Sequence, residues 1–449
     1  MALSGVEIFK YLPKTNCKKC GHPTCLAFAM KLAAKQASLD ACPDASEEAK
    51  AFLGAASEPP IRPITIGAGP KALKVGEETV LFRHEKKFVN PCGLALQVKD
   101  TDSEADIAAK AKAVADSEVE RVGQKLRVEL VAVSNESGDP AKFAAAVKAA
   151  AGAAPDAGMV LMSSDAAAIE QALPAAAGKK PLIYAADASN WEKMVAIAKG
   201  AGASLAVKAD GIDALTELVE KIVATGFRDL VMDPGARNPK DMVEQYTQIR
   251  RAAVKKNFKP MGYPVISFAV NDDPYMEQAM ASVAIAKYAA IVVLSDISRW
   301  KVAALISLRQ NLYTDPQVPM QVSQNVYKVG DAKAESPLII TTNFSLTYFI
   351  VLGEVENSKV PSWLAVMETE GLSVLTAWAA GKFTAAKIAQ YIQESGIEQQ
   401  VAHKELIIPG YVAVLSGALE DKLPGWKITV GPREANALPA FLKNKAAAA

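Results

Sequence analysis

The chain has 449 residues, of which 50% are hydrophobic and 22% are charged, and its formal net charge is +1. The length predicts a globular protein of roughly two to four domains, and the charge balance offers no basic surface to a nucleic-acid backbone. No apolar run reaches the ~20 residues of a membrane span, and Met1–Glu7 lacks the basic and apolar regions of a signal peptide. We therefore expect a cytoplasmic protein that binds neither nucleic acid nor membrane.

Four of the five cysteines lie within the first 42 residues, in the pattern C-x2-C-x4-C-x16-C. Cytoplasmic thiols stay reduced, so clustered cysteines indicate metal or redox chemistry. A cubane iron–sulfur cluster takes four thiolates, and a proline after the last cysteine is typical of bacterial ferredoxins. Structural zinc is the alternative, although zinc ribbons usually carry two C-x2-C pairs and this chain has one. We predict a domain over residues 1–57 that binds a [4Fe-4S] cluster through Cys17, Cys20, Cys25 and Cys42.

A helical pattern over Cys25–Leu39 separates the third cysteine from the fourth. The prolines of Ser57–Pro63 then break any helix and stiffen the chain into an extended linker. Residues 58–92 are expected to connect two domains, with strand-like runs around Leu73–Val75 and Val80–Phe82 that could form a small hairpin. Cys92 stands alone at the end of this connector, and a lone cysteine is more often a small buried hydrophobe than a ligand.

From Gly93 onward, short apolar runs alternate with alanine-rich helical patterns, which is typical of a parallel sheet. The expected strands are Leu94–Val98, Val128–Val133, Met159–Met162, Leu182–Ala185, Leu205–Val207, Leu230–Met232, Val265–Ala269 and Ile291–Leu294. The expected helices include Ser103–Val122, Pro140–Ala151, Trp191–Gly200, Gly211–Thr225, Asp241–Val254, Pro274–Tyr288 and Ser298–Leu312. This repetition predicts a TIM (β/α)8 barrel over residues 93–325, with an open doubly wound sheet as the alternative.

A second α/β pattern begins near Ser336, after the barrel ends at Asn311–Pro316. Its expected strands are Leu338–Thr341, Leu364–Val366, Leu406–Ile408 and Lys427–Val430. We predict a small, open, Rossmann-like sheet in a domain of residues 326–449. The fold class is therefore α/β, with a small N-terminal domain, a central barrel and a C-terminal open sheet.

The chain resembles the large (gamma) subunit of the corrinoid iron–sulfur protein of the acetyl-CoA (Wood–Ljungdahl) pathway, also known as subunit gamma of the acetyl-CoA decarbonylase/synthase complex. The segment Gly5–Cys25 carries the most specific part of the resemblance, which covers essentially the whole chain. The segments Ile340–Asn343 and Glu370–Thr376 resemble the corrinoid-binding loops of that family.

The resemblance implies a methyl carrier with a B12-type corrinoid in its C-terminal domain. Cobalt in the Co(I) state would accept a methyl group from methyltetrahydrofolate, or a methanopterin analogue, through a methyltransferase. Methyl-Co(III) would pass it to acetyl-CoA synthase, while the [4Fe-4S] cluster would reduce cobalt that has drifted to Co(II). The chain would thus be the corrinoid component of a methyltransferase system, with little chemistry of its own.

The implied partners are a small barrel subunit that forms a heterodimer with this chain, the methyltransferase, acetyl-CoA synthase/CO dehydrogenase, and a low-potential electron donor such as ferredoxin. In this family the corrinoid lies at the junction of the large and small subunits. Two other functions stay open from the residues alone. One is a barrel enzyme with a ferredoxin-like electron inlet, and the other is an electron-transfer subunit without a corrinoid.

The expected corrinoid contacts follow strand ends, where open α/β sheets bind ligands. Short hydroxyl and amide side chains suit the corrin amides, glycines let backbone approach a flat macrocycle, and new helices offer free N–H groups to a phosphate. Serine and threonine at such positions are also common helix caps. The predicted contacts are Thr341, Thr342, Asn343, Thr347, Glu370, Gly371, Leu372, Ser373, Val374, Leu375, Thr376, Gly410, Gly417, Gly431, Pro432, Arg433, Glu434 and Ala435.

Many B12 proteins carry a D-x-H-x-x-G motif whose histidine binds cobalt. The three histidines here are His22, His84 and His403, and none stands in that pattern. We therefore expect a base-off corrinoid without a protein histidine ligand, which makes Co(I) easier to reach because a strong axial donor favours the higher oxidation state.

Acidic or amide side chains also follow five barrel strands, where TIM barrels place catalytic residues. Aspartate after a strand is equally the usual N-cap of the next helix. We favour capping, and we assign no catalytic residue in the barrel. The side chains concerned are Asp187, Asp210, Asp233, Asn271 and Asp296.

Overall fold

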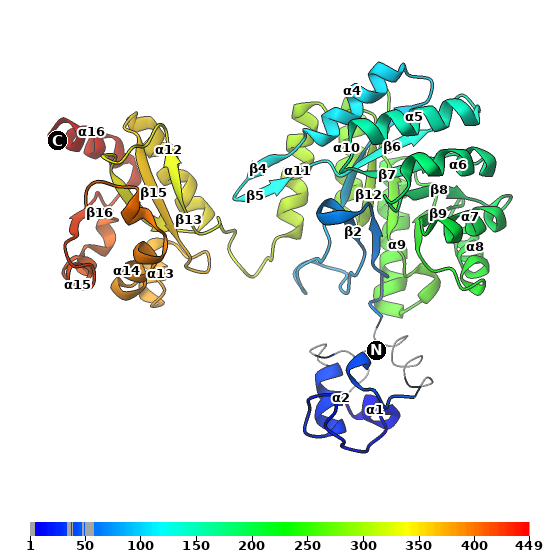
Figure 1. Ribbon diagram of the computed structural model, residues 1–449, viewed down its shortest axis with the longest axis horizontal. Helices are drawn as coiled ribbons and strands as arrows, with labels where there is room; N and C mark the ends of the chain where they lie inside the picture. The colour runs from blue at the N-terminus through cyan, green and yellow to red at the C-terminus, as the bar shows by residue number, and fades with distance from the viewer. Residues whose placement is uncertain (1–4, 34–36, 38, 47–48, 50–57, 449) are drawn as a thin grey trace. The chain divides into compact units, whose positions relative to one another are not determined.

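The computed structural model (Figure 1) describes residues 5–448 apart from 34–36, 38, 47–48 and 50–57. The chain divides into two compact units, Met1–Ser117 with Val128–Tyr313, and Glu118–Arg127 with Thr314–Ala449. The α/β fold class is confirmed, with a closed barrel in the first unit and an open sheet in the second. No helix in the described part of the chain is both long enough and apolar enough to cross a membrane.

The N-terminal segment contains α1 (Gly5–Tyr11), α2 (Cys25–Ala33) and the short helix η1 (Leu39–Ala41). A small core joins Ile8 and Leu12 to Phe28, which is 1% exposed. The described part of α2 ends at Ala33, and most of the remaining predicted helix to Leu39 lies outside the described residues.

All eight predicted barrel strands are present and close into a parallel barrel in the order β10-β11-β12-β3-β6-β7-β8-β9. The runs are apolar throughout because parallel barrel strands are buried on both faces. The strands are β3 (Gly93–Lys99), β6 (Leu130–Ser134), β7 (Gly158–Met162), β8 (Leu182–Ala186), β9 (Ser204–Lys208), β10 (Leu230–Asp233), β11 (Val265–Phe268) and β12 (Ala289–Leu294). The helices around them are α4 (Glu104–Ala115), α5 (Pro140–Ala153), α6 (Ala166–Ala172), α7 (Trp191–Ala201), α8 (Ile212–Ala224), α9 (Pro239–Lys256), α10 (Pro274–Ala286) and α11 (Arg299–Tyr313).

The linker forms a hairpin that closes the amino-terminal end of the barrel. Strand β1 (Ile64–Ile66) pairs antiparallel with β2 (Leu73–Val75), and their apolar side chains join the barrel interior. A Cβ added at Gly93 would lie 2.3 Å from the Leu73 side chain, so the hairpin packs directly on the barrel floor. The predicted partner strand Val80–Phe82 was wrong, because Ile64–Ile66 takes that place.

A second hairpin leaves the barrel sequence and packs in the other unit. The predicted helix Ser103–Val122 ends at Ala115, and β4 (Val119–Arg121) then pairs with β5 (Gln124–Leu126). The turn residue Val122 joins the core of the C-terminal unit, and the Ser323 hydroxyl donates a 3.3 Å hydrogen bond to the Gly123 carbonyl. The second unit therefore includes residues from within the barrel sequence.

The C-terminal sheet has five strands in the order β13-β15-β14-β16-β17. The four predicted strands are present and parallel, and an antiparallel strand that we had not predicted, β13, lies at one edge. The strands are β13 (Asn325–Val329), β14 (Leu338–Thr342), β15 (Ser362–Met367), β16 (Glu405–Ile408) and β17 (Lys427–Val430). The helices are α12 (Ser345–Ser358), α13 (Val374–Ala379), α14 (Ala385–Glu394), α15 (Ser416–Lys422) and α16 (Leu438–Ala448).

Helices cover both faces of this sheet. Side chains of α12 and α16 share a core with Ile339 on one face, while those of α14 and α15 share a core with Leu338 and Ile340 on the other. The chain runs from β14 to β15 on one side and later returns to β16 on the other side of β14. The carboxyl ends of β14 and β16 therefore form the topological switch point, where open α/β sheets bind ligands.

Candidate functional site

The four predicted cysteine ligands are all free thiols, and three of them belong to or pack against one small core, namely Cys20, Cys25 and Cys42. Cys25 and Cys42 are buried, Cys20 is half-buried, and Cys17 is exposed. Asn16 fixes the loop, because its side-chain oxygen accepts a 2.8 Å hydrogen bond from the Cys25 amide. Its own amide lies 3.4 Å from the Cys25 sulfur, which places a donor at a predicted ligand.

The cysteine segment has the charge pattern of a metal-binding loop. Burial, together with the nearby thiols of Cys20, Cys17 and Cys25, raises the pKa of Cys42. Four thiolates so placed repel one another unless a cation compensates them, and iron or zinc supplies that charge. In the described part of the chain, no three His, Cys, Asp or Glu side chains are placed to hold a single metal ion. The assignment of the four cysteines as ligands of one metal centre stays a prediction.

An ion pair connects the two parts of the cysteine segment. Lys19 Nζ lies 3.1 Å from an Asp44 carboxylate oxygen, and this contact joins the first loop to the segment after Cys42. The hydrogen bond from Lys19 holds the pKa of Asp44 below its usual value.

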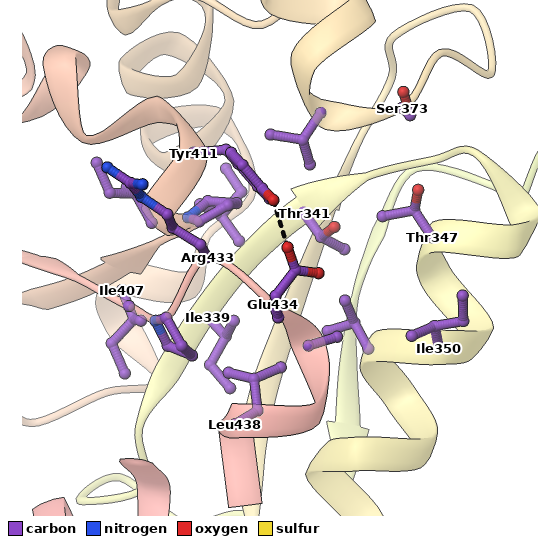
Figure 2. A pocket seen from close by; sticks show the side chains of 18 of the residues that line it. Ile339, Thr341, Thr347, Ile350, Ser373, Ile407, Tyr411, Arg433, Glu434 and Leu438 are labelled. Atoms are coloured by element: carbon purple, nitrogen blue, oxygen red, sulfur yellow. Dashed lines mark hydrogen bonds between the residues drawn. The ribbon is translucent and has the colours of Figure 1, made fainter.

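The second candidate site is a cavity of about 320 Å³ at the switch point of the C-terminal sheet (Figure 2). Its floor is formed by β14 and β16, and its walls come from α12, from the start of α13 and from the segment after β17. Ten of the predicted corrinoid contacts line it: Thr341, Thr347, Ser373, Val374, Leu375, Gly431, Pro432, Arg433, Glu434 and Ala435.

The cavity is mainly apolar and has a few polar groups. Thr341 is 1% exposed, and its hydroxyl has no hydrogen-bond partner in the described structure. The Tyr411 hydroxyl donates to the Glu434 carboxylate across the cavity (Figure 2), and this contact raises the pKa of Tyr411. A buried hydroxyl without a partner costs free energy, which a ligand acceptor or donor would recover.

The other eight predicted contacts do not line the cavity: Thr342, Asn343, Glu370, Gly371, Leu372, Thr376, Gly410 and Gly417. Gly410 meets protein backbone, since a Cβ there would lie 2.5 Å from the Gly431 carbonyl oxygen. Its N–H donates to the Pro432 carbonyl and is not free for a phosphate. A role of these eight residues in cofactor binding stays a prediction.

Asn343 organises the loop between β15 and α13. Its side-chain oxygen accepts hydrogen bonds from the Thr369 amide at 3.0 Å, the Thr369 hydroxyl at 2.9 Å and the Gly371 amide at 3.1 Å. Its side-chain nitrogen donates to Glu368 at 2.9 Å and to Gln321 at 3.3 Å. With 0% exposure, Asn343 holds in place the loop that leads to the cavity-lining residue Ser373.

An Asn343→Ala substitution should destabilise the C-terminal unit by about 2–4 kcal/mol, because it leaves buried donors without an acceptor. Amide hydrogen exchange at Thr369 and Gly371 should become faster in the full chain. Thr376→Ala is the control, because that hydroxyl contacts only the exposed Ser373 hydroxyl, at 3.0 Å. Unchanged exchange at the two amides in Asn343→Ala would show that Asn343 does not hold the loop.

His403 lies at the other end of β14. Its Nε2 is 2.8 Å from the Ser336 carbonyl, and its Nδ1 accepts a 3.2 Å hydrogen bond from the Glu405 amide. Both ring nitrogens are therefore engaged by backbone, in a different cavity from that of Thr341.

The strand-end side chains of the barrel cap fewer helices than we expected. The N-cap residues of α7, α8, α9 and α10 are Asn190, Gly211, Asn238 and Asp273. Asp187, Asn271 and Asp296 instead accept backbone N–H groups within their own loops, and Asp210 lies against the Gly235 turn.

Asp233 is fully buried and belongs to a polar cluster at the carboxyl end of the barrel. Its oxygens accept hydrogen bonds from Arg237 at 2.6 Å and 3.0 Å and from the Tyr184 hydroxyl at 2.6 Å. Burial, followed by the charge of Asp233, raises the pKa of Tyr184. Arg237 neutralises the buried carboxylate, and Tyr184 satisfies it further, so the burial of Asp233 is compensated by its own neighbours.

Sequence reasoning missed the apolar lining of the cavity and its tyrosine. The only local signal was the strand-to-loop motif Ile408-Pro409-Gly410-Tyr411, from which we had selected the glycine alone. The lining residues that we had not selected are Ile339, Ile340, Ile350, Val351, Ile407, Ile408, Pro409, Tyr411 and Leu438.

One compact unit of the chain contains a four-cysteine segment and a closed barrel, and the other contains an open sheet with a cavity at its switch point. A family model described as the CO dehydrogenase/acetyl-CoA synthase delta subunit matches residues 63–442, and an Fe-S cluster family matches residues 12–43. The corrinoid/iron-sulfur protein large subunit of Moorella thermoacetica is 47% identical over 99% of this chain and 99% of that protein. The acetyl-CoA decarbonylase/synthase complex subunit gamma of Methanopyrus kandleri is 35% identical over 99% of this chain and 98% of that protein.

The chain therefore belongs to the family of these corrinoid/iron-sulfur large subunits and complex gamma subunits. Among solved structures, the dihydropteroate synthase of Yersinia pestis is 17% identical, with a TM-score of 0.36 over 50% of this chain and 94% of that protein.

Proposed function

We propose that this chain is a methyl carrier whose corrinoid occupies the cavity at the carboxyl ends of β14 and β16. The observation that carries the proposal is the buried, unpartnered Thr341 hydroxyl in an apolar cavity at the switch point of the sheet. Membership of the corrinoid/iron-sulfur protein family supports the identity of the ligand. When bound, the corrinoid would supply a cobalt that can carry a methyl group between a pterin-dependent methyltransferase and acetyl-CoA synthase.

The residues of the cavity hold and orient the cofactor. Apolar side chains such as Ile339 and Leu438 exclude water from one part of the ligand. Thr341, Thr347 and Ser373 offer hydroxyls to amide groups, and Arg433 offers a cation to a phosphate. The proposed corrinoid is base-off and has no protein histidine ligand to cobalt.

We propose that a [4Fe-4S] cluster returns oxidised cobalt to its active state. The proposed ligands of this cluster are Cys17, Cys20, Cys25 and Cys42. The mutual electrostatic influence of the four thiols, the common core of Cys20, Cys25 and Cys42, and the match of residues 12–43 to an Fe-S cluster family support this assignment. A low-potential carrier such as ferredoxin would supply the electron.

The rim of the cavity suits a protein partner. The elements that line the cavity also expose large apolar side chains, among them Phe349 (45% exposed), Trp378 (40%) and Val414 (71%). Large apolar side chains that stay exposed on the elements of a site favour contact with another protein. We propose that a small barrel subunit covers this rim as the heterodimer partner, and that the methyltransferase and acetyl-CoA synthase/CO dehydrogenase reach the corrinoid in turn.

Protein purified without oxygen should show the cobalt bands of a corrinoid above the broad cluster absorption. Those bands should change when the protein is reduced and when it is methylated. Metal analysis should find about four iron atoms per chain and cobalt, as expected for one cubane cluster and one corrinoid. Stoichiometric zinc without iron would overturn the cluster, and the absence of cobalt would overturn the corrinoid.

A further inference from the structure

Among the four cysteines of the segment, Cys17 is the most accessible. Only Cys17 is exposed, while Cys25 and Cys42 are buried. All residues from Lys14 to Lys19 are exposed. Electron transfer between proteins falls steeply with distance, so a partner that exchanges electrons with this segment gains most from meeting it at Cys17.

The sequence around Cys17 is basic. Residues 12–25 contain three lysines and no aspartate or glutamate, although the whole chain carries a formal net charge of only +1. Lys19 is paired with Asp44 at 3.1 Å. Lys18 has no ion-pair partner among the described residues, and Lys14 contacts only the Phe9 ring, with its Nζ 5.8 Å from the ring centroid. Two uncompensated cations therefore lie in sequence on either side of Cys17.

The backbone around Cys17 has an unusual conformation. Lys14, Asn16 and Lys18 all have positive φ angles, of 59°, 50° and 62°. Such conformations are uncommon for residues with side chains, and three of them in five residues turn the backbone on both sides of Cys17. Lys14 and Lys18 are exposed three residues before and one residue after Cys17, so a partner that meets this short segment meets both cations.

We infer that the edge formed by Lys14, Cys17 and Lys18 is the docking surface for a small, acidic, low-potential electron carrier. The inference rests on the proposed cluster. One electron passes from the reduced carrier to the oxidised cluster, so the carrier is oxidised, the cluster is reduced, and no bond forms or breaks. Redox complexes are small and transient, and charge complementarity steers their association and orientation.

The test compares charge-reversed and charge-conserved variants of the full chain, with a two-cluster bacterial ferredoxin as the acidic probe. Lys14→Glu with Lys18→Glu should weaken binding in calorimetry by about tenfold or more at low salt, because close charge pairs become repulsive. Lys14→Arg with Lys18→Arg should bind like the unmodified chain. Lys148→Glu with Lys221→Glu, on exposed positions of α5 and α8, makes the same charge change on the barrel and should have no effect.

Salt and redox measurements complete the test. The affinity of the unmodified chain should fall between about 50 mM and about 300 mM salt, since exposed charges are screened over a Debye length, and the charge-reversed chain should lose most of this dependence. Equal affinity in the two chains would overturn the inference. The inference would also be overturned if the charge-reversed chain had a shifted cluster reduction potential but an unchanged affinity for the ferredoxin. The lysines would then affect only the reduction potential of the cluster. Missing iron in the unmodified chain would instead refute the proposed function, before any binding is measured.

Discussion

A Cys20→Ala chain should lose or degrade its iron–sulfur cluster and still accept a methyl group after chemical reduction to Co(I). Co(I) would supply the electron pair of the new cobalt–carbon bond and would keep that pair when the methyl group leaves as a cation equivalent, so no external electron would be consumed in each cycle. Accidental oxidation gives Co(II), which cannot attack a methyl group. Because a low-potential electron is needed only at that point, recovery from Co(II) with a protein electron donor should fail in the variant.

Cys92→Ala is the matched control for this substitution. Cys92 is fully buried outside the cysteine segment, and burial raises the pKa of its thiol to about 12, so it is inert as a ligand. The Cys92→Ala chain should keep the iron content of the unmodified chain and should recover from Co(II) at the same rate. Iron analysis, the electron paramagnetic resonance signal of the reduced protein and the rate of cobalt reduction are the measurements. A pre-reduced Cys20→Ala chain that cannot accept a methyl group would assign the cluster to the transfer step itself and contradict this role.

The barrel could be predicted from local sequence because its strands are buried on both faces and alternate with long helices. The missed strands have no such signature. Strand β13 lies at a sheet edge, and only Val329 of its five residues is buried. Strands β4 and β5 have no buried residue. Their packing in the C-terminal unit depends on contacts about 200 positions away in the chain, such as that between Gly123 and Ser323.

The candidate site was predictable to the extent that topology determines it. The strand ends around Thr341 and Gly431 could be located from the order of apolar runs. Local sequence cannot tell whether a polar side chain faces a ligand or its own loop, and Asn343 turned out to serve the loop. It also cannot tell a cavity wall from a core, which is why Ile350 and Leu438 were missed.

A Thr347→Trp substitution should reduce corrinoid binding by about tenfold or more, which corresponds to about 1.4 kcal/mol. Thr347 lies in the first turn of α12, is half-buried and points into the cavity (Figure 2). An indole there occupies space that the cofactor needs, and the apolar surroundings accept the ring without exposing it. Titration of cofactor-free protein with hydroxocobalamin, followed by visible absorption, measures the effect.

Two companion variants make the outcome specific to the cavity. Thr347→Ser keeps the hydroxyl and should bind the corrinoid like the unmodified chain. Glu356→Trp places the same ring on an exposed position of the same helix, away from the cavity lining, and should also bind normally. Iron content should be unchanged in all three variants, because the cysteine segment lies in the other compact unit of the chain. If Thr347→Trp bound a full equivalent of corrinoid with unchanged affinity, the cofactor would have to lie outside this cavity, and the eight predicted contacts away from its lining would become the next residues to test.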